Sequence, residues 1–352
     1  MESSDHEFSE ELESSDDYSP RLHSISMEEV GTRLDMVVCQ LYPGVSRGQV
    51  QRWIADAHVL IDQAIAKSST TVRLGQTITA APPKPVPQTQ WIGQSIPVEI
   101  LHQDPDVIVI NKPVGLVVHP GAGNPDGTLA NALLYQYPEL AGLPRCGLVH
   151  RLDRDTSGVM VVARSLRAHA ELVRQLQLRS VSRAYIALAW GVLNSSIRLE
   201  NAMGRDPRNR QKMSVLLPDK GKIAITRFSP VAHGLIADCP VTLIHCALET
   251  GRTHQIRVHA EFIKHPLVGD KSYARGAPSR GVKVINEWQD SESRNLVGQA
   301  LHAWRLKFTH PGTGRALAFK AGITSTVRDL LLTALKQDGY AAWEKLFSQE
   351  MI

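Results

Sequence analysis

The sequence predicts an α+β protein whose larger part contains a mixed, largely antiparallel sheet with flanking helices. Short apolar runs typical of strands recur at residues 107–110, 185–190, 224–228 and 241–248, and segments of helical periodicity lie between them. Helices and strands do not alternate regularly, and no internal repeat is visible. A parallel βαβ architecture is therefore not favoured, and a mixed sheet is the better prediction.

The N-terminal segment differs from the rest of the chain in charge. Its first 30 residues carry ten acidic side chains and one basic side chain, Arg21, so the net charge of this segment is −9. Because the whole chain of 352 residues carries +4, the remainder carries +13. Residues 1–24 also contain few large apolar groups, so we predict an acidic disordered tail there.

Residues 25–80 predict a small α/β domain. Apolar side chains at helical spacing predict a helix over residues 34–41, and Ser46 is a candidate N-cap for a second helix. Residues 59–61 predict a strand, and residues 72–78 predict a turn followed by another strand.

Residues 81–95 contain four prolines, which predicts a stiff linker and a domain boundary. A larger domain is predicted to follow over residues 96–346. In it, Thr128 is a candidate N-cap, residues 167–178 have a helical pattern, and apolar residues from 327 to 335 predict a C-terminal amphipathic helix.

The basic remainder of the chain fits a polyanionic partner, most simply nucleic acid, although a solvated basic surface explains it as well. A basic stretch over residues 205–222 permits two similar interpretations, an RNA-phosphate clamp or a solvated hairpin, and residues 275–299 predict a variable loop. The four cysteines lack metal-binding spacing, so we expect buried free thiols. No apolar run is long enough for a bilayer, and the acidic N-terminus is unlike a targeting signal. We therefore expect a cytoplasmic protein without a membrane partner.

A polar run lies at residues 150–158, between two apolar runs. It contains two carboxylates, three cations if its histidine is charged, and two hydroxyls. A polar loop between two buried strands is where a rigid scaffold presents chemistry. Taken alone, either aspartate fits a loop cap, and Asp155, which can accept from the amides of Ser157 or Gly158, fits this role better than Asp153.

This run, His-Arg-Leu-Asp-Arg-Asp-Thr-Ser-Gly, resembles the catalytic motif of the RluA family of RNA pseudouridine synthases. Lysine is usual in the family at the position of Arg154, so the charge is kept. Further motifs of the family have counterparts in order along the chain, at residues 111–121, 182–185, 251–259 and 301–303.

The first domain resembles the S4-type RNA-binding domain. The resemblance is carried by residues 33–35, 46–47 and 59–62, and the β-turn has Asp-Gln here in place of the usual Asn-Gly. It implies that Arg47 and Arg52, on the second predicted helix, contact RNA.

The resemblance to the synthase family implies that Asp153 is the essential residue and that Arg257 pairs with it. It also implies that Tyr185 stacks on a uracil flipped out of the RNA and assists proton movement at C5. The reaction breaks the N1–C1′ bond of uridine and rejoins the base through C5, so it needs no cofactor and no metal. Asp153 either attacks C1′ or removes the C2′ proton, and the sequence leaves both routes open. Four more residues are expected to contact RNA, with a scaffold role left open for each: Arg151, Lys112, His119 and His302.

Residues 117–128 and the order of the domains resemble the RluD type of this family. That type modifies uridines in helix 69 of large-subunit (23S) ribosomal RNA, so we expect 23S rRNA or a large-subunit precursor as partner, and a monomeric enzyme. Two alternatives stay open: a member of the family that acts on another RNA, and a non-catalytic RNA-binding or ribosome-assembly protein. Dinucleotide-binding, metal-hydrolase and kinase motifs each fail in spacing or in ligands.

Overall fold

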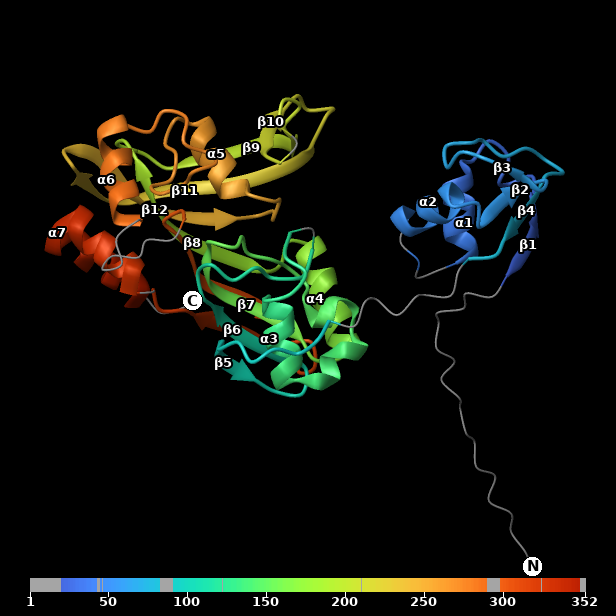
Figure 1. The fold of residues 1–352 in the computed structure, drawn as a ribbon, viewed down its shortest axis with the longest axis horizontal. Coiled ribbons are helices and arrows are strands. Elements are labelled where there is room, and N and C mark those ends of the chain that lie inside the picture. Colours follow the sequence, from blue (N-terminus) through green and yellow to red (C-terminus); the bar gives the residue numbers. More distant parts are fainter. Residues whose placement is uncertain are drawn as a thin grey trace, which may run out of the picture. The chain divides into compact units, whose positions relative to one another are not determined.

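The structure, a computed structural model, describes residues 20–42, 45, 47–82, 91–121, 123–209, 211–289, 298–323 and 325–348 (Figure 1). The chain divides into two compact units, residues 1–90 and residues 91–352, and each has its own apolar core. The division falls inside the predicted linker. Three of the linker's four prolines, Ser46 and the predicted tail up to residue 19 lie outside the described residues.

The first unit is a four-stranded antiparallel sheet with two helices. Its strand order is β1-β4-β2-β3. The elements are β1 (Arg21–Ser24), α1 (Leu34–Leu41), α2 (Arg47–Ala55), β2 (Val59–Ile61), β3 (Ala64–Ile65) and β4 (Thr77–Ala80). Both predicted helices are confirmed. The prediction that the disordered tail reaches residue 24 is wrong, because β1 extends the sheet by pairing with β4.

A buried carboxylate joins the two helices of this unit. Asp35 is fully buried and accepts hydrogen bonds from Arg33 Nε at 3.1 Å, Arg47 Nε at 3.1 Å and Gln51 Nε2 at 2.7 Å. The hydrogen bond from Arg33 holds the pKa of Asp35 well below its ordinary value, and burial opposes this shift. Arg47, an expected RNA contact, therefore has a structural partner, whereas Arg52 is exposed.

The second unit is built on a ten-stranded sheet. Its strand order is β10-β9-β11-β12-β8-β13-β7-β6-β5, with β14 paired to β13. The strands are β5 (Glu99–Gln103), β6 (Val107–Lys112), β7 (Ser157–Ala163), β8 (Ser182–Trp190), β9 (Ile197–Arg205), β10 (Met213–Leu216), β11 (Lys222–Ile236), β12 (Cys239–Leu248), β13 (Leu301–Thr309) and β14 (Ala316–Lys320). Among the described strands only β13 and β7 pair in parallel, so the predicted mixed, largely antiparallel sheet is confirmed.

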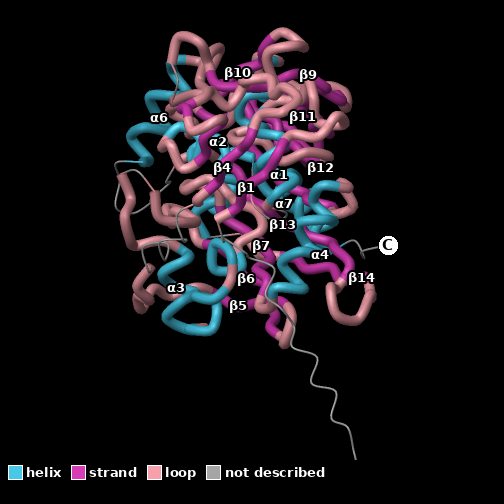
Figure 2. The backbone as a smooth tube through the Cα atoms, turned by 90° about the vertical axis from the view of Figure 1, so that its right-hand side faces the viewer, coloured by secondary structure: helices cyan, strands magenta, loops and turns pink. Residues whose placement is uncertain are grey.

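Helices pack on both faces of this sheet (Figure 2). They are α3 (Leu129–Gln136), α4 (Leu166–Gln177), α5 (Gln255–Phe262), α6 (Ser279–Gln289) and α7 (Ser325–Ser348). On β8, Tyr185 and Ala187 belong to the core cluster that contains α3 and α5, while Ile186 and Leu188 belong to the cluster that contains α6 and α7. Because successive side chains of a strand alternate between its faces, β8 is buried on both sides.

The predicted variable loop at residues 275–299 is wrong in its first half, where α6 forms. Ile285 is buried, and Val284 and Trp288 pack against the same cluster, which gives the helix an apolar face. A Cβ on Gly281 would lie 2.4 Å from the Trp190 ring, so this helix lies directly against β8. Residues 290–297 lie outside the described part of the chain.

Three composition-based predictions have mixed outcomes. The four cysteines are free, and Cys146 and Cys246 are buried as predicted, whereas Cys39 and Cys239 are half-buried. In the described part of the chain, no helix is both long and apolar enough to cross a membrane. The basic stretch at residues 205–222 contains β10, which pairs with β9 as a hairpin, and its RNA contacts stay a prediction.

Replacing Asp35 by Ala is expected to destabilise the first unit by about 1–3 kcal/mol. The loss is smaller than for a fully buried ion pair because the side chains of Arg33 and Arg47 are 44% and 51% exposed. Hydrogen exchange of peptides covering α1 and α2 measures this change. Because folding lowers the pKa of Asp35, its contribution is present above the ordinary carboxyl pKa and is lost as the pH falls. A difference between wild type and variant that stays constant from about pH 6 to pH 2 would contradict the interpretation.

Candidate active site

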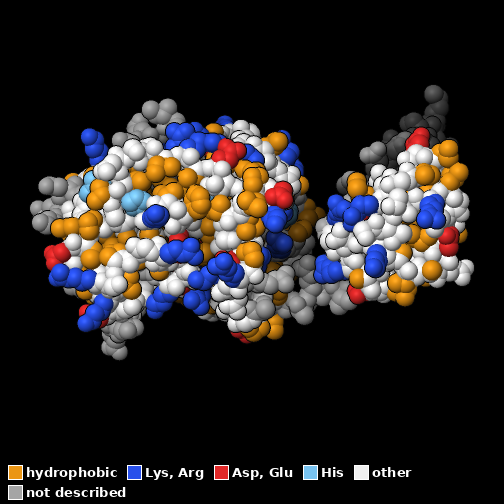
Figure 3. All heavy atoms as spheres, turned by 90° about the horizontal axis from the view of Figure 1, so that it is seen from above, with side chains coloured by type: hydrophobic (Ala, Val, Ile, Leu, Met, Phe, Trp, Pro, Cys, Tyr) orange, Lys and Arg blue, Asp and Glu red, His pale blue; other side chains and the backbone are white. Residues whose placement is uncertain are grey.

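A cleft of about 570 Å³ lies in the second unit. Its walls come from the loop before β7, the start of β8, the segment between β12 and α5, and the end of α4. The arginines that line it are Arg145, Arg151, Arg179, Arg183, Arg252 and Arg257. Its carboxylates within the described chain are Asp153 and Glu249, so the cleft is basic. Figure 3 shows basic side chains spread over the face of this unit seen there, with fewer acidic ones.

A buried lysine holds the loop that carries Asp153. Lys112, at the end of β6, is fully buried and donates to the backbone carbonyls of Pro113, Leu116 and Arg154 at 2.7, 2.8 and 2.9 Å. The last of these carbonyls belongs to the loop, next to Asp153. Burial lowers the pKa of Lys112 to about 7, against the opposing charge of the loop carboxylates.

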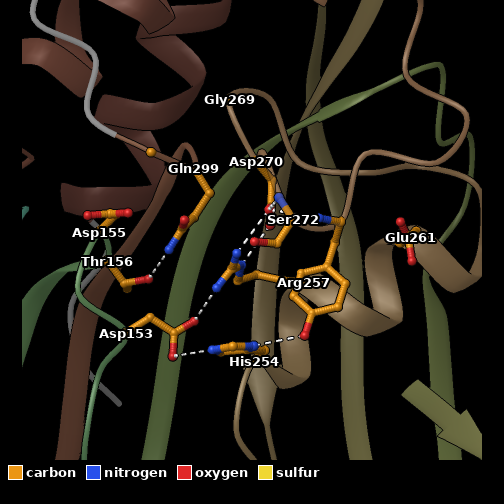
Figure 4. A network of polar contacts seen from close by, with 12 residues as sticks. Asp153, Asp155, Thr156, His254, Arg257, Glu261, Gly269, Asp270, Ser272 and Gln299 are labelled. Atoms are coloured by element: carbon orange, nitrogen blue, oxygen red, sulfur yellow. Dashed lines mark hydrogen bonds and ion pairs between the residues drawn. The ribbon is translucent and has the colours of Figure 1, made fainter. Parts of the chain in front are cut away.

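Two further hydrogen bonds shape the same loop. The backbone N–H of Thr156 donates to the carbonyl of Asp153 at 3.1 Å, which closes a turn. Gln299 Nε2 donates to Thr156 Oγ1 at 2.9 Å and ties this turn to the segment before β13 (Figure 4). Asp153 is therefore held by hydrogen bonds within the turn and by hydrogen bonds from other segments of the chain.

The end of the loop is fixed against β13. His302 Nε2 lies 3.1 Å from the carbonyl of Ala321 and must donate to it, so its Nδ1 accepts from Ser157 Oγ at 2.9 Å. Burial lowers the pKa of His302 to about 4, which keeps it neutral. A Cβ on Gly158, whose φ is +119°, would lie 2.1 Å from the carbonyl oxygen of Ala303. Only glycine permits this approach of β7 to β13.

These positions correct two expectations. Lys112 and His302 have no exposed surface, and their donors are directed at backbone carbonyls. They hold the loop in place, and a ligand could reach them only by breaking these hydrogen bonds, so the geometry favours the scaffold role over RNA contact.

Asp153 forms an ion pair with Arg257, which also binds a second carboxylate. Arg257, on α5, donates from Nη1 to Asp153 Oδ2 at 3.0 Å. Its Nε and Nη2 donate to the two oxygens of Asp270 at 2.6 and 2.9 Å (Figure 4). Burial alone would lower the pKa of Arg257, but Asp270 and then Asp153 raise it above its ordinary value. The expected proximity of Arg257 to Asp153 is therefore present in the structure.

A histidine faces the second oxygen of Asp153. His254, at the N-cap of α5 with a left-handed φ of 56°, places Nε2 3.9 Å from Asp153 Oδ1. Its Nδ1 lies 2.8 Å from Tyr273 Oη, which accepts from the backbone N–H of Met213. Burial lowers the pKa of His254, and Asp153 opposes this shift. In the neutral ring, Tyr273 Oη donates to Nδ1, and the Nε2 proton is then directed at the carboxylate.

The remaining candidates of the second unit have different surroundings. Tyr185 is 7% exposed and lines the cleft, and burial raises its pKa to about 12. His119 also lines the cleft, and its buried Nδ1 has no hydrogen-bond partner within the described residues. Arg151 is exposed at the cleft wall. The cleft thus brings Tyr185, His119 and Arg151 together with Asp153 and Arg257.

Two expectations about the polar run need correction. Asp155 accepts from Arg154 Nε at 3.0 Å and does not accept from the amides of Ser157 or Gly158, because the turn closes on Asp153 instead. The histidine at the start of the run is not a cation. Burial lowers the pKa of His150 to about 3, and its Nε2 accepts from a backbone N–H of β7.

Sequence reasoning missed Asp270 and Tyr273 as members of the site, and it did not place His254 beside Asp153. Asp270 directly follows an apolar run and Gly269, which is a weak signal for a functional carboxylate after a strand-like segment. His254 lies inside the recognised motif at residues 251–259, but only the fold shows that it faces Asp153. In the described part of the chain, no cluster of three or more His, Cys, Asp or Glu is placed to bind a metal ion.

Comparison with known proteins finds relatives over most of the chain. Residues 106–262 match the family model described as RNA pseudouridylate synthase, and residues 32–78 match the S4 domain model. The "Ribosomal large subunit pseudouridine synthase D" of Xanthomonas campestris pv. campestris is 42% identical, over 93% of this chain and 96% of that protein. The protein of the same name from Pseudomonas aeruginosa is 41% identical, over 92% and 98%. The solved structure of Human RNA Pseudouridylate Synthase Domain Containing 1 superposes with a TM-score of 0.53 at 25% identity, covering 74% of this chain and 98% of that one.

Replacing Asp270 by Ala is expected to lower the free energy of unfolding of the second unit by about 3–5 kcal/mol, because Arg257 loses two of its hydrogen bonds inside the protein. Asp270→Asn is the matched control. Its carbonyl oxygen still accepts from the backbone amides of Ser272 and Tyr273, so we expect a smaller loss. Denaturant unfolding measures both. A cost below about 1 kcal/mol for Asp270→Ala would show that Asp153 alone compensates the guanidinium.

Proposed function

The chain belongs to the RNA pseudouridylate synthase family, and we propose that it isomerises uridines of large-subunit (23S) ribosomal RNA to pseudouridine. Members of this family are isomerases, so the protein is an enzyme. The choice of RNA is supported by relatives that are 40–42% identical and are named for the ribosomal large subunit. The S4 domain at residues 32–78 supports an RNA partner independently.

The arrangement around Asp153 carries the proposal. Its Oδ2 accepts from Arg257, while Oδ1 lies 3.9 Å from His254 Nε2 and forms no hydrogen bond within the described chain. A neighbouring cation favours the ionised carboxylate. One oxygen is therefore anchored, and the other is available to react with a nucleotide in the cleft.

Two chemical routes fit this arrangement. In the first, Oδ1 attacks C1′ as the N1–C1′ bond breaks, which leaves a sugar ester and a uracil anion; C5 then attacks C1′ and releases the carboxylate. In the second, Oδ1 removes the C2′ proton as uracil departs, and this proton returns to C2′ when C5 has bonded to C1′. In both routes C5 finally loses a proton and N1 gains one, so atoms and electrons balance without a cofactor. Glycosidases likewise place an ionised carboxylate next to the anomeric carbon whose bond is broken.

Tyr185 fits the role of a platform for the displaced base. A uridine in a folded RNA must leave its stack to reach Asp153, and an aromatic ring in the cleft compensates for the lost stacking. Burial keeps the phenol of Tyr185 protonated at neutral pH. We therefore assign Tyr185 to stacking and hydrogen bonding, and not to proton removal as a phenolate.

The proposal extends to the target site in the RNA and to the residues that bind it. The similarity of residues 117–128 to the RluD type favours target uridines in the helix 69 stem-loop. Arg151 at the cleft wall and Arg52 on the S4 domain are exposed, and we propose that they contact the RNA backbone. Arginine side chains commonly bind the phosphate groups of nucleic acids. The enzyme is proposed to act in the cytoplasm, as a monomer and without a cofactor.

Replacing Asp153 by Asn is expected to abolish pseudouridine formation while RNA binding is kept, because the amide is neither an anion nor a comparable nucleophile. Purified full-length protein and a 23S rRNA transcript, without metal or nucleotide, provide the assay, and carbodiimide-stop sequencing maps the product. Asp155→Asn is the matched control, since it makes the same change two residues away, where the carboxylate pairs with Arg154. If the wild type and Asp153→Asn both bind tightly and both leave the RNA unmodified, the protein is an RNA-binding factor and not a synthase.

Replacing Arg257 by Ala is expected to lower the single-turnover rate by at least about 100-fold with little change in RNA affinity, because its donors are directed at Asp153 and Asp270 inside the protein. Filter binding beside the rate measurement separates the two effects. A large loss of affinity at an unchanged rate would reassign Arg257 to phosphate binding.

Tyr185 is expected to stay protonated well above the ordinary phenol pKa. Because burial raises its pKa to about 12, an absorbance titration of the free protein between about pH 9 and pH 11 should detect the same number of ionising phenols in wild type and Tyr185→Phe. One additional phenol that titrates near pH 10 only in the wild type would contradict the buried position of Tyr185.

A further inference from the structure

Arg183 is a buried guanidinium without a counter-charge. It lies on β8 two residues before Tyr185, hence on the same face of the strand, and it lines the cleft. It is 9% exposed, and its Nε is enclosed without a partner. Within the described chain, the side chain of Arg183 has no hydrogen bond, ion pair or ring contact. Arg257 is buried to a similar extent, at 7%, but has two carboxylate partners.

No carboxylate of the cleft is available to Arg183. Asp153 pairs with Arg257, and Glu249 pairs with Arg198. Burial lowers the pKa of Arg183, the phenol of Tyr185 opposes this shift, and the like charge of its neighbour Arg252 adds to it. An unpaired buried cation is unfavourable, and a second cation beside it adds repulsion. Proteins retain such an arrangement where a ligand supplies the missing negative charge.

The backbone beside Arg183 is shaped to admit its guanidinium. A Cβ on Gly251 would lie 2.4 Å from Arg183 Nη1, so any larger residue displaces the end of this side chain. The φ of Gly251 is not in the left-handed region, so the glycine is needed for space and not for its backbone conformation. Arg252, the next residue, is anchored by its Nε, which donates to the carbonyl of Ile223 at 3.2 Å. Its two terminal nitrogens form no hydrogen bond within the described chain.

We propose that Arg183 and Arg252 form a binding site for one phosphodiester group of the substrate RNA, next to the nucleotide that stacks on Tyr185. This inference rests on the proposed function, since it assumes that RNA enters the cleft. A phosphodiester fits because it carries a full negative charge and offers two oxygens to a planar guanidinium fork. The oxygens of a neutral uracil do not balance two cations. The target nucleotide is thereby held through its backbone as well as its base.

RNA binding tests the site in an Asp153→Asn background, where no turnover intervenes. Arg183→Met keeps the length of the side chain and removes the charge. We expect it to weaken binding of a 23S rRNA transcript by about 10- to 100-fold. The slope of log affinity against log salt concentration should fall by nearly one. Arg280→Gln, which removes a 71% exposed arginine paired with Asp238, is the matched control and should leave both quantities unchanged.

Two more variants separate charge from geometry. Arg183→Lys should keep the salt slope and lose part of the affinity, because an ammonium group lacks the fork. Gly251→Ala keeps every charge but moves the guanidinium, and it should weaken binding several-fold. The melting temperature of the RNA-free Arg183→Met protein should not fall, because the change removes an uncompensated charge.

Three results would overturn the proposal. A clearly lower melting temperature with an unchanged salt slope would make Arg183 a structural residue. A lower single-turnover rate in the Asp153-containing enzyme, at unchanged affinity and slope, would assign Arg183 to the base instead of the backbone. No change in any of these quantities would exclude the site. Failure of the proposed function is distinguishable, because wild type would then form no pseudouridine while the binding measurements still report on Arg183.

Discussion

The guanidinium of Arg257 is the group on which the rest of the site depends. It is buried between two carboxylates, and each of the three charges is tolerable only because the others are present. Only arginine offers a planar fork for Asp270 and a further N–H for Asp153. The three residues come from a loop, a helix and a turn, and 104 positions of sequence separate Asp153 from Arg257. The tertiary fold thus orients the carboxylate of Asp153.

The protein uses buried polar groups to fix a loop that must remain polar at its tip. Lys112 donates to three backbone carbonyls, and His302 connects Ser157 to Ala321. A fully satisfied buried network of this kind makes a loop rigid, whereas apolar packing alone does not specify the direction of a carboxylate. The cost of burying these groups is offset by complete hydrogen bonding, and the result is a preorganised Asp153.

Residue patterns predicted which residues meet in the site better than they predicted how deeply each residue is buried. The similarity of two motifs placed Arg257 beside Asp153, and the ion pair lies where it was expected, because the motifs record residue types that the reaction needs. The same motifs did not show that Lys112 and His302 are buried, since a polar side chain looks alike in sequence whether it binds RNA or a backbone carbonyl. Asp270 was missed because only tertiary approach brings its turn to Arg257. The edge strand β1 was missed because few apolar residues mark it, and helix α6 was missed because its apolar face lies in a polar segment that contains Gly and Ser. Packing on a neighbouring element supplies the stability of both.

The position of β13 has a consequence for the order of events during synthesis. This strand is among the last elements of the chain, yet it lies between β7 and β8 in the middle of the sheet and contacts both. A nascent chain that still lacks it has β7 and β8 unpaired on their inner edges, so the loop of Asp153 and the strand of Tyr185 have no common support. We expect the enzyme to become active only when translation has passed residue 309, as a late, non-local closing step.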